Sequence, residues 1–425
     1  MKTLHLTNSW HASSGGIRTF YRELLKAAES HQRQMRLIVP SETTHVETVN
    51  AYARIYHVAA PRSLLFDSRY RLLLPHTYLW QKTVRQILYN EQPDLIEVCD
   101  KYALSWLAGL IRKGWLSNVQ RPALVGLSCE RMDDNVAAWI TGNAVSRKLT
   151  QLYLRECYLP LFDYHIANSH YTASELQQAM SARHERLVVV RPMGVNIGLF
   201  SPTRRNAEDR LKLLTLVAGN ERTRLLLYAG RLSAEKNLPL LLETLRCLRR
   251  DECRDFRLIM AGAGPLENWL CQESMRFTTQ CVHLQGQLNN PTALASLYAN
   301  CDAFLHPNPR EPFGIAPLEA MAVGLPLIAP NAGGVLSYAN SENAWLAEPH
   351  GEAFADAVRD VFSDDEVRWY RIARARRTAE RYEWEKVTAE FFNLYDRLHQ
   401  MATEETSTGR FSKAKHSKWK LAPDS

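Results

Sequence analysis

Short apolar runs alternate with amphipathic helical stretches along nearly the whole chain. The runs are rich in leucine and β-branched residues and are bounded by polar turns, which is typical of buried parallel strands. In the first half this pattern predicts strands at residues 3–6, 36–39, 55–59, 95–98, 123–127, 165–167 and 187–190, and in the second half at 225–228, 257–260, 282–284, 303–306, 327–329 and 345–347. The alternation therefore predicts two doubly wound α/β sheets with helices on both faces.

At 425 residues the chain is too long to fold around a single hydrophobic core of ordinary size. Its length suits two domains of about 200 residues each. A polar stretch between them, residues 202–223, carries one apolar patch and is predicted to be the interdomain connection. Beyond Glu352 the pattern turns wholly helical. We predict an N-terminal domain (1–205), a C-terminal domain (220–383), a helix packing back on the N-terminal domain (384–402) and a disordered basic tail (403–425).

One basic and apolar stretch, residues 61–89, departs from this rhythm. It is either an inserted helical element that covers the core or a docking surface for a membrane or an apolar acceptor. The second interpretation follows from its mixture of aromatic and cationic side chains, which suits an anionic interface.

Composition places the chain among globular proteins, with 46% hydrophobic and 23% charged residues. The net charge of +7 favours anionic partners without choosing between nucleic acid, an acidic membrane and phosphorylated substrates. Basic residues are dispersed, except in the tail, at Lys413, Lys415, Lys418 and Lys420. That run either touches membrane phosphate or is a solvated terminus.

The eight cysteines contain no C-x-x-C pair and fall mostly in apolar stretches, which indicates reduced core residues. The N-terminus lacks the apolar region of a signal peptide, and no apolar run reaches the roughly 18 residues that span a bilayer. We expect a cytoplasmic protein, with peripheral contact at the inner membrane face as a further expectation.

The most informative segment runs from the end of a predicted strand through a loop into a helix and carries Glu311 and Glu319. Both carboxylates would face one crevice at the carboxyl edge of a parallel sheet. The amides of Phe313, Gly314 and Ile315 precede the helix and are placed to receive phosphate oxygens. Glu319 is suited to ribose hydroxyls and Glu311 to a donor sugar. Alternatively, both glutamates are exposed charges at a helix end.

A second loop, after the strand at 225–228, carries Arg231 and Lys236, and a helix begins near Leu238. From the residues alone, Arg231 could pair with Glu235, and Lys236 could simply be solvated. The segment from Glu311 to Glu319 resembles the E-x7-E signature of the retaining glycosyltransferases of family 4, and the loop with Arg231 and Lys236 resembles a second feature of that family, which lies upstream. That resemblance implies a GT-B fold, in which two Rossmann-like doubly wound domains face a central cleft. It also implies that Arg231 and Lys236 hold a nucleotide diphosphate and neutralise its growing charge.

Loops that contain glycine are weaker indications of where a ligand binds. The resemblance places Gly264 and Gln287 beside the donor nucleotide, although the base is not legible from these residues. It places Gly15 and Gly16, which join the first strand to a helix at 17–28, near the donor phosphate and the acceptor. A purely structural turn is the alternative for this glycine pair.

The sequence departs from the family pattern after the strand at 123–127. Many relatives carry a histidine there, whereas this chain continues into Glu130 and Asp133. Glu130, or else Asp133, is a candidate to replace the histidine in contact with the donor sugar. Surface acidity explains these residues equally well.

These inferences predict retaining transfer of a glucosyl or mannosyl hexose from a nucleoside-diphosphate sugar to a hydroxyl acceptor, in glycan, glycolipid or exopolysaccharide synthesis. Glu311, Arg231, Lys236 and Glu130 are the predicted catalytic residues. No cofactor and no metal ion are expected, because D-x-D and His/Cys ligand spacings are missing, and no nucleic acid is expected. The alternatives are a nucleotide-sugar epimerase on the same fold and a catalytically silent nucleotide-sugar-binding protein.

Overall fold

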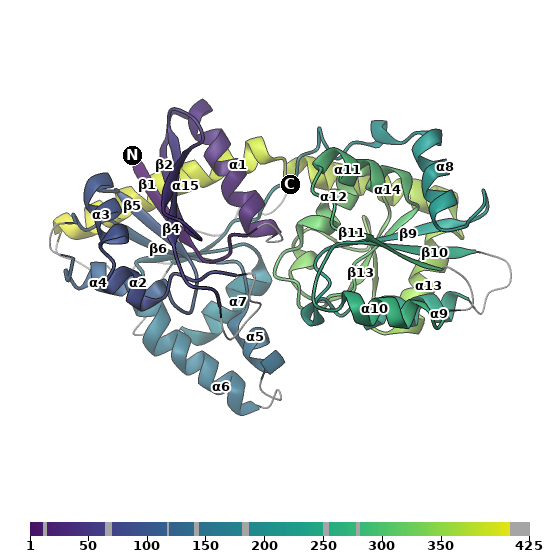
Figure 1. The fold of residues 1–425 in the computed structure, drawn as a ribbon, viewed down its shortest axis with the longest axis horizontal. Helices are drawn as coiled ribbons and strands as arrows, with labels where there is room; N and C mark the ends of the chain where they lie inside the picture. The colour runs from purple at the N-terminus through teal and green to yellow at the C-terminus, as the bar shows by residue number, and fades with distance from the viewer. Residues whose placement is uncertain are drawn as a thin grey trace.

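The computed structural model describes residues 1–11, 15–63, 70–116, 119–139, 144–180, 187–249, 255–277 and 281–408. Two separate sheets organise these residues, one in each half of the chain (Figure 1). Their strands are buried along most of their length, as expected for parallel sheets covered on both faces. The predicted pair of doubly wound α/β sheets is confirmed.

The N-terminal sheet has eight strands in the order β3-β4-β2-β1-β5-β6-β7-β8, and every neighbouring pair is parallel except β3 and β4. The strands are β1 (Lys2–Thr7), β2 (Gln34–Ser41), β3 (His45–Thr48), β4 (Ala53–Ala59), β5 (Leu95–Cys99), β6 (Ala123–Ser128), β7 (Tyr164–Ala167) and β8 (Leu187–Val190). The helices are α1 (Gly16–Ser30), α2 (Pro75–Leu79), α3 (Lys82–Glu91), α4 (Ser105–Arg112), α5 (Met132–Trp139), α6 (Ala144–Tyr153), η1 (Leu154–Tyr158), η2 (Leu159–Leu161) and α7 (His170–Ala179).

The C-terminal sheet has six parallel strands in the order β11-β10-β9-β12-β13-β14. They are β9 (Arg224–Ala229), β10 (Phe256–Ala261), β11 (Val282–Gly286), β12 (Ala303–Leu305), β13 (Leu327–Pro330) and β14 (Trp345–Ala347). The helices are η3 (Pro202–Arg204), α8 (Ala207–Leu216), η4 (Ala234–Lys236), α9 (Pro239–Leu248), α10 (Glu267–Ser274), α11 (Pro291–Asn300), α12 (Ile315–Val323), η5 (Gly334–Ser337), α13 (Gly351–Val361), α14 (Asp365–Arg381) and α15 (Trp384–Thr408).

Two local features differ from the prediction, and a third, the inserted stretch at 61–89, forms helices in its described part, as one of its two interpretations predicted. The edge strand β3 was not predicted, because three of its four residues are exposed and give no apolar signal. The connection at 202–223 holds η3 and α8, and Asn206 caps α8 by accepting a hydrogen bond from the Asp209 amide. The inserted stretch at 61–89 contains α2 and most of α3, and residues 64–69 lie outside the described part of the chain.

Helix α15 leaves the C-terminal half and crosses to the N-terminal sheet, where Figure 1 draws it in yellow. Its Tyr395 hydroxyl donates to Glu97 Oε2 on β5 at 2.7 Å. The other carboxylate oxygen, Oε1, accepts from Tyr21 at 3.0 Å and lies 2.9 Å from His5 Nδ1. All four side chains are buried, so this polar cluster fixes α15 to the N-terminal half.

Two expectations concern the chain as a whole. The seven cysteines within the described residues form no disulfide with one another, and Cys253 lies outside those residues. The described helices include none with the length and apolar character needed to cross a membrane.

The Glu97 cluster predicts the effect of Tyr395→Phe. Removing the hydroxyl leaves a buried carboxylate oxygen without its donor, so the free energy of unfolding should fall by about 1–3 kcal/mol. Tyr370→Phe on α14, a side chain that is 55% exposed, is the control and should change it by less than about 0.5 kcal/mol. Denaturant titration compares the two variants, and equal effects would show that the cluster does not hold α15.

Candidate active site

The loops after β9 and β12 bring Lys236 and Glu311 together. The two strands are adjacent and parallel, so their carboxyl ends lie at the same edge of the sheet. Lys236 Nζ lies 2.7 Å from Glu311 Oε2, and Asn308 Nδ2 donates to the same oxygen at 3.1 Å. The Glu311 side chain is only 13% exposed. The alternative that this glutamate is an exposed helix-end charge is therefore wrong.

Electrostatics keep Glu311 ionised. Burial would raise its pKa, but Lys236, His306 and the hydrogen bond from Asn308 together lower the pKa to about 2. His306 is itself buried, and burial lowers its pKa to about 4. At neutral pH the imidazole is therefore uncharged, and Lys236 is the cation that pairs with Glu311.

Arg231 lies on the same loop as Lys236. Its Nη1 is 3.6 Å from Glu235 Oε1, so the predicted alternative partner is present. Both side chains of that pair are about a third or more exposed, which makes the interaction weak. The guanidinium also lies 5.8 Å from the ring centre of Tyr70, a residue of the N-terminal half. Among the described residues, no hydrogen-bond partner reaches the buried Nε of Arg231.

Glu319 is the fifth residue of α12 and is partly buried. Burial raises its pKa to about 7, although a hydrogen bond from the Tyr298 hydroxyl at 3.2 Å opposes that shift. The two glutamates of the motif thus differ in ionisation. Glu311 is a fixed anion, while Glu319 changes protonation near neutral pH.

The start of α12 is held rigidly. Gly314 precedes the helix with φ of 85°, a left-handed conformation that favours glycine. The Phe313 ring is 2% exposed and packs against Tyr338, whose hydroxyl donates to the Gly314 carbonyl at 2.5 Å. The buried Phe313 side chain therefore anchors the loop. The backbone amide of Phe313 is the group of this residue that is suited to bind phosphate. Ile315 opens the helix itself.

Gly264, the remaining predicted glycine of this half, and its neighbour Gly262 allow close contact between two loops. A Cβ atom at Gly264 would lie 2.2 Å from the Leu232 carbonyl oxygen, and one at Gly262 would lie 1.9 Å from that of Gly230. These glycines are required for packing between the loops after β9 and β10. Gln287 follows β11 and is exposed.

The N-terminal half also contacts this region through Gly16 and Ser169. A Cβ at Gly16, the first residue of α1, would lie 3.2 Å from Ile315 Cδ1, whereas Gly15 faces open space. Ser169, which caps α7, donates from its hydroxyl to the Pro312 carbonyl at 2.5 Å. The predicted glycine pair and the Glu311 loop therefore lie on opposite sides of one contact between the halves.

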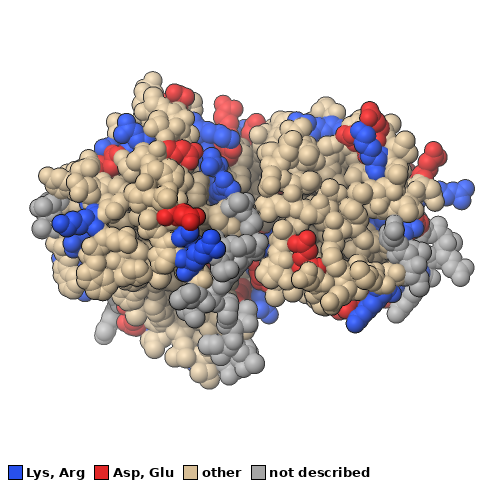
Figure 2. Space-filling view, viewed as in Figure 1, with Lys and Arg blue, Asp and Glu red and all other residues tan. Residues whose placement is uncertain are grey.

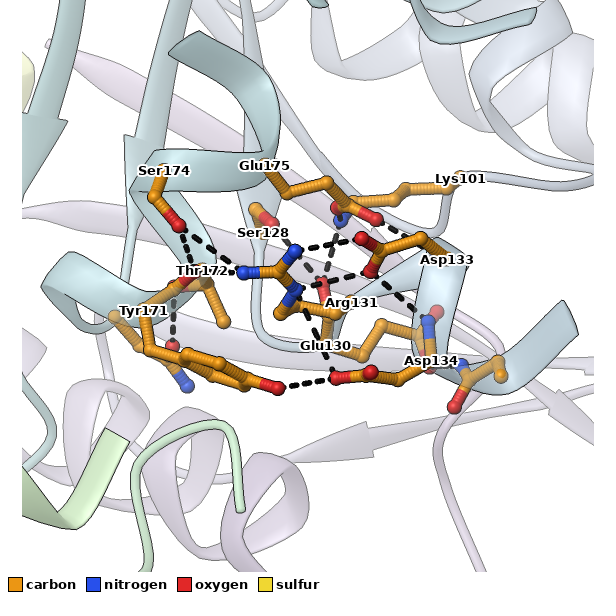
Figure 3. A network of polar contacts seen from close by, with 12 residues as sticks. Lys101, Ser128, Glu130, Arg131, Asp133, Asp134, Tyr171, Thr172, Ser174 and Glu175 are labelled. Atoms are coloured by element: carbon orange, nitrogen blue, oxygen red, sulfur yellow. Dashed lines mark hydrogen bonds and ion pairs between the residues drawn. The ribbon is translucent and has the colours of Figure 1, made fainter. Parts of the chain in front are cut away.

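Glu130 lies in the loop between β6 and α5, within the polar network of Figure 3. Lys101, whose side chain is 1% exposed, donates to the Glu130 carbonyl and to Glu175 Oε2, each at 2.5 Å. The Glu130 carboxylate accepts from Asn135 Nδ2 at 3.0 Å, and burial raises its pKa. It also lines a cavity of about 10 Å³, which is the size of one water molecule.

Asp133 has a structural role. Both of its oxygens accept hydrogen bonds from the Arg131 guanidinium, at 2.9 and 2.6 Å, as Figure 3 shows. The same guanidinium donates to Ser174 on α7 at 3.0 Å. The alternative that Asp133 replaces the missing histidine is not supported, because this ion pair occupies its carboxylate. Glu130 stays the candidate.

Sequence reasoning missed three residues that surround the two glutamates. Asn308 and His306 follow β12 directly, and their position between a strand and Glu311 is a signal that could have identified them. Tyr298 lies on α11, which precedes β12 in the sequence. Nothing near it in the sequence points to Glu319, so only the packing of α11 against α12 reveals that contact.

Known proteins resemble this chain in sequence and in fold. Residues 217–378 match the family model described as glycosyl transferases group 1. A GDP-mannose-dependent alpha-(1-6)-phosphatidylinositol dimannoside mannosyltransferase of Mycobacterium tuberculosis is 27% identical over 92% of this chain and 94% of its own length.

Solved structures extend the likeness to the fold. A sucrose-phosphate synthase of Thermosynechococcus elongatus superposes with a TM-score of 0.73 at 19% identity, covering 94% of this chain and all of its own. Anabaena HepE in complex with UDP-glucose gives a TM-score of 0.65 at 19% identity over 96% of this chain and all of its own. The fold is GT-B, as predicted, and the chain is a glycosyltransferase.

The raised pKa of Glu319 predicts a pH-dependent stability. Below about pH 4.5 the carboxyl is protonated in the folded and unfolded chain alike, and between pH 4.5 and about 7 only the unfolded chain ionises it. Glu319→Gln should therefore gain stability relative to the parent across this window, by about 1–3 kcal/mol, and hold that gain above pH 7. Denaturation at pH 5 and pH 8 measures this.

Glu29→Gln, at an exposed position of α1, is the control and should show no such change with pH. A constant difference between Glu319→Gln and the parent at the two pH values would contradict the buried, protonated carboxyl.

Proposed function

We propose that this chain is a retaining enzyme resembling family 4 of the glycosyltransferases and transfers a glucosyl or mannosyl residue from a nucleoside-diphosphate sugar to a hydroxyl. The observation that carries the proposal is the Lys236–Glu311 pair. It lies at the carboxyl edge of β9 and β12, and the loop that holds Glu311 leads directly into the N-terminus of α12. Cations, a fixed carboxylate and helix amides meet there, which suits an anionic ligand that carries a sugar.

Each group has a proposed role toward the donor. Arg231 and Lys236 bind the diphosphate, and the buried Arg231 Nε is a donor available to it. Glu311 accepts hydrogen bonds from the sugar hydroxyls, and Glu319 accepts them from the ribose. The amides of Phe313, Gly314 and Ile315 receive phosphate oxygens, while Gly264 and Gln287 lie toward the nucleotide.

The chemical step needs no protein base. The bond from the anomeric carbon to the diphosphate oxygen breaks, and a bond from that carbon to the acceptor oxygen forms on the same face. The acceptor proton passes to the departing diphosphate oxygen. Arg231 and Lys236 stabilise the charge that develops on that oxygen, so the proposal includes no metal ion and no cofactor.

The acceptor side belongs to the N-terminal half. We propose that Gly15, Gly16 and Glu130 face the acceptor and the donor sugar. The mycobacterial relative is named for GDP-mannose and a phosphatidylinositol dimannoside, whereas HepE was solved with UDP-glucose. These names support a hexose donor and a glycolipid acceptor, and they leave the base undecided between guanine and uracil.

A glycolipid acceptor implies contact with an anionic membrane surface, which we include in the proposal. A cytoplasmic location at the inner membrane face is consistent with described cysteines that form no disulfide. Nucleic acid has no part in this function.

The diphosphate role of Lys236 is tested with Lys236→Ala. Losing this cation should lower kcat/KM at least about tenfold, or roughly 1.4 kcal/mol in the transition state, and should weaken binding of UDP or GDP. Steady-state rates and calorimetry measure both effects. Lys212→Ala on α8, which removes a 64% exposed lysine from a surface ion pair, is the matched control.

A second variant separates charge loss from misfolding. Lys236→Met combined with Glu311→Gln removes the unpaired carboxylate, so it should recover thermal stability without recovering diphosphate affinity. Unchanged kinetics in Lys236→Ala would refute the diphosphate assignment. Isomerised donor sugar formed without any acceptor would instead identify an epimerase.

A further inference from the structure

Helix α6 has the reverse of the usual polarity of a surface helix. Val145, Leu149 and Leu152 fall at helical spacing and are 61%, 61% and 46% exposed. Ser146 and Thr150 are each 4% exposed and face the protein, where the Thr150 hydroxyl donates to the Ser146 carbonyl at 3.0 Å. The apolar stripe therefore faces outward, and a contiguous exposed stripe marks an interaction surface.

The charges of α6 indicate the kind of partner. Arg147 and Lys148 are exposed, and Lys148 borders the stripe by its helical position. Helix α6 contains no aspartate or glutamate, and in η1, which continues it, Glu156 is paired with Arg155. A surface that combines apolar side chains with a net positive charge suits the headgroup region of an anionic bilayer. Two copies of this chain would bring the same cations together at a two-fold interface, so charge opposes self-association.

The position of α6 connects this surface with the candidate site. Figure 1 shows α6 projecting from the N-terminal half, next to α5, and Figure 2 shows this projection as mainly tan. Helix α5 begins two residues after Glu130, and the Arg131–Asp133 pair ties its first turn to α7 (Figure 3). A bilayer against α6 would therefore lie on the acceptor side of the chain.

We propose that the outward face of α6, formed by Val145, Leu149 and Leu152 with Arg147 and Lys148, docks the enzyme on an anionic membrane. Docking presents a lipid-linked acceptor to the loop that holds Glu130. This inference rests on the proposed function for the lipid nature of the acceptor, but the docking itself does not require sugar transfer.

The full chain is tested by flotation with vesicles of phosphatidylcholine alone or of phosphatidylcholine and phosphatidylglycerol in equal parts. It should bind only the anionic vesicles. Leu149→Ser should raise the lipid concentration for half-binding about tenfold, as expected for one lost apolar contact. Lys148→Gln should raise it about fivefold, as expected for one cation near an anionic surface.

Matched control variants test whether vesicle binding depends on α6 and not on other exposed leucines or cations. Leu211→Ser on α8 replaces a leucine that is 64% exposed in the C-terminal half, and Arg222→Gln removes an exposed cation there, so neither should change binding. A full-length variant with Lys413, Lys415, Lys418 and Lys420 changed to Gln should retain at least part of the binding. Circular dichroism of each variant should match that of the parent.

Three results would overturn the proposal. They are undiminished vesicle binding in Leu149→Ser, complete loss of binding in the tail variant alone, and a dimer that Leu149→Ser disrupts without any vesicle binding. Affinity for UDP and GDP is measured in parallel and should be equal in Leu149→Ser and the parent. Failure of the parent to bind either nucleotide would count against the proposed function and leave the docking result unaffected.

Discussion

The contact between Lys236 and Glu311 is the interaction on which the candidate site depends. It joins the loops after β9 and β12, neutralises a carboxylate that burial would otherwise protonate, and leaves that carboxylate ionised at neutral pH. Hydrogen bonds from Asn308 and the tyrosine-anchored start of α12 hold the same loop. A polar site is therefore built before any ligand arrives, which reduces the ordering cost of binding.

A second buried carboxylate, Glu97, plays the corresponding role for the arrangement of the halves. It accepts hydrogen bonds from Tyr21 of α1 and Tyr395 of α15, so the last helix of the chain belongs physically to the first sheet. The halves also touch beside the site, through Ser169 and Pro312. The two halves are therefore joined both by α15 and by a contact beside the candidate site.

Sequence periodicity was sufficient for the fold, because parallel strands buried on both faces leave continuous apolar runs. Periodicity missed β3, whose residues are mostly exposed. Glu311, Lys236 and Arg231 were predicted from the family motif instead, and the structure brings Lys236 and Glu311 together. The sequence could not assign Tyr298 to Glu319, nor show that Gly264 serves the packing of two loops, since both facts depend on distant neighbours. The exposure of the apolar stripe on α6 could not be predicted either, because periodicity indicates that a helix is amphipathic but not which of its faces the rest of the protein covers.

Glu311 and Glu319 are proposed to bind different parts of one donor. The most direct test of this proposal is calorimetric titration of UDP and of GDP into the parent, Glu311→Gln and Glu319→Gln. At pH 8, where Glu319 is ionised, Glu319→Gln should weaken binding of the preferred nucleotide by about tenfold or more, since hydrogen bonds from ribose to a charged acceptor are worth about 1.5–3 kcal/mol. Glu311→Gln should keep the parent affinity or exceed it, because Lys236 is released. Equal losses in both variants would contradict the division of roles.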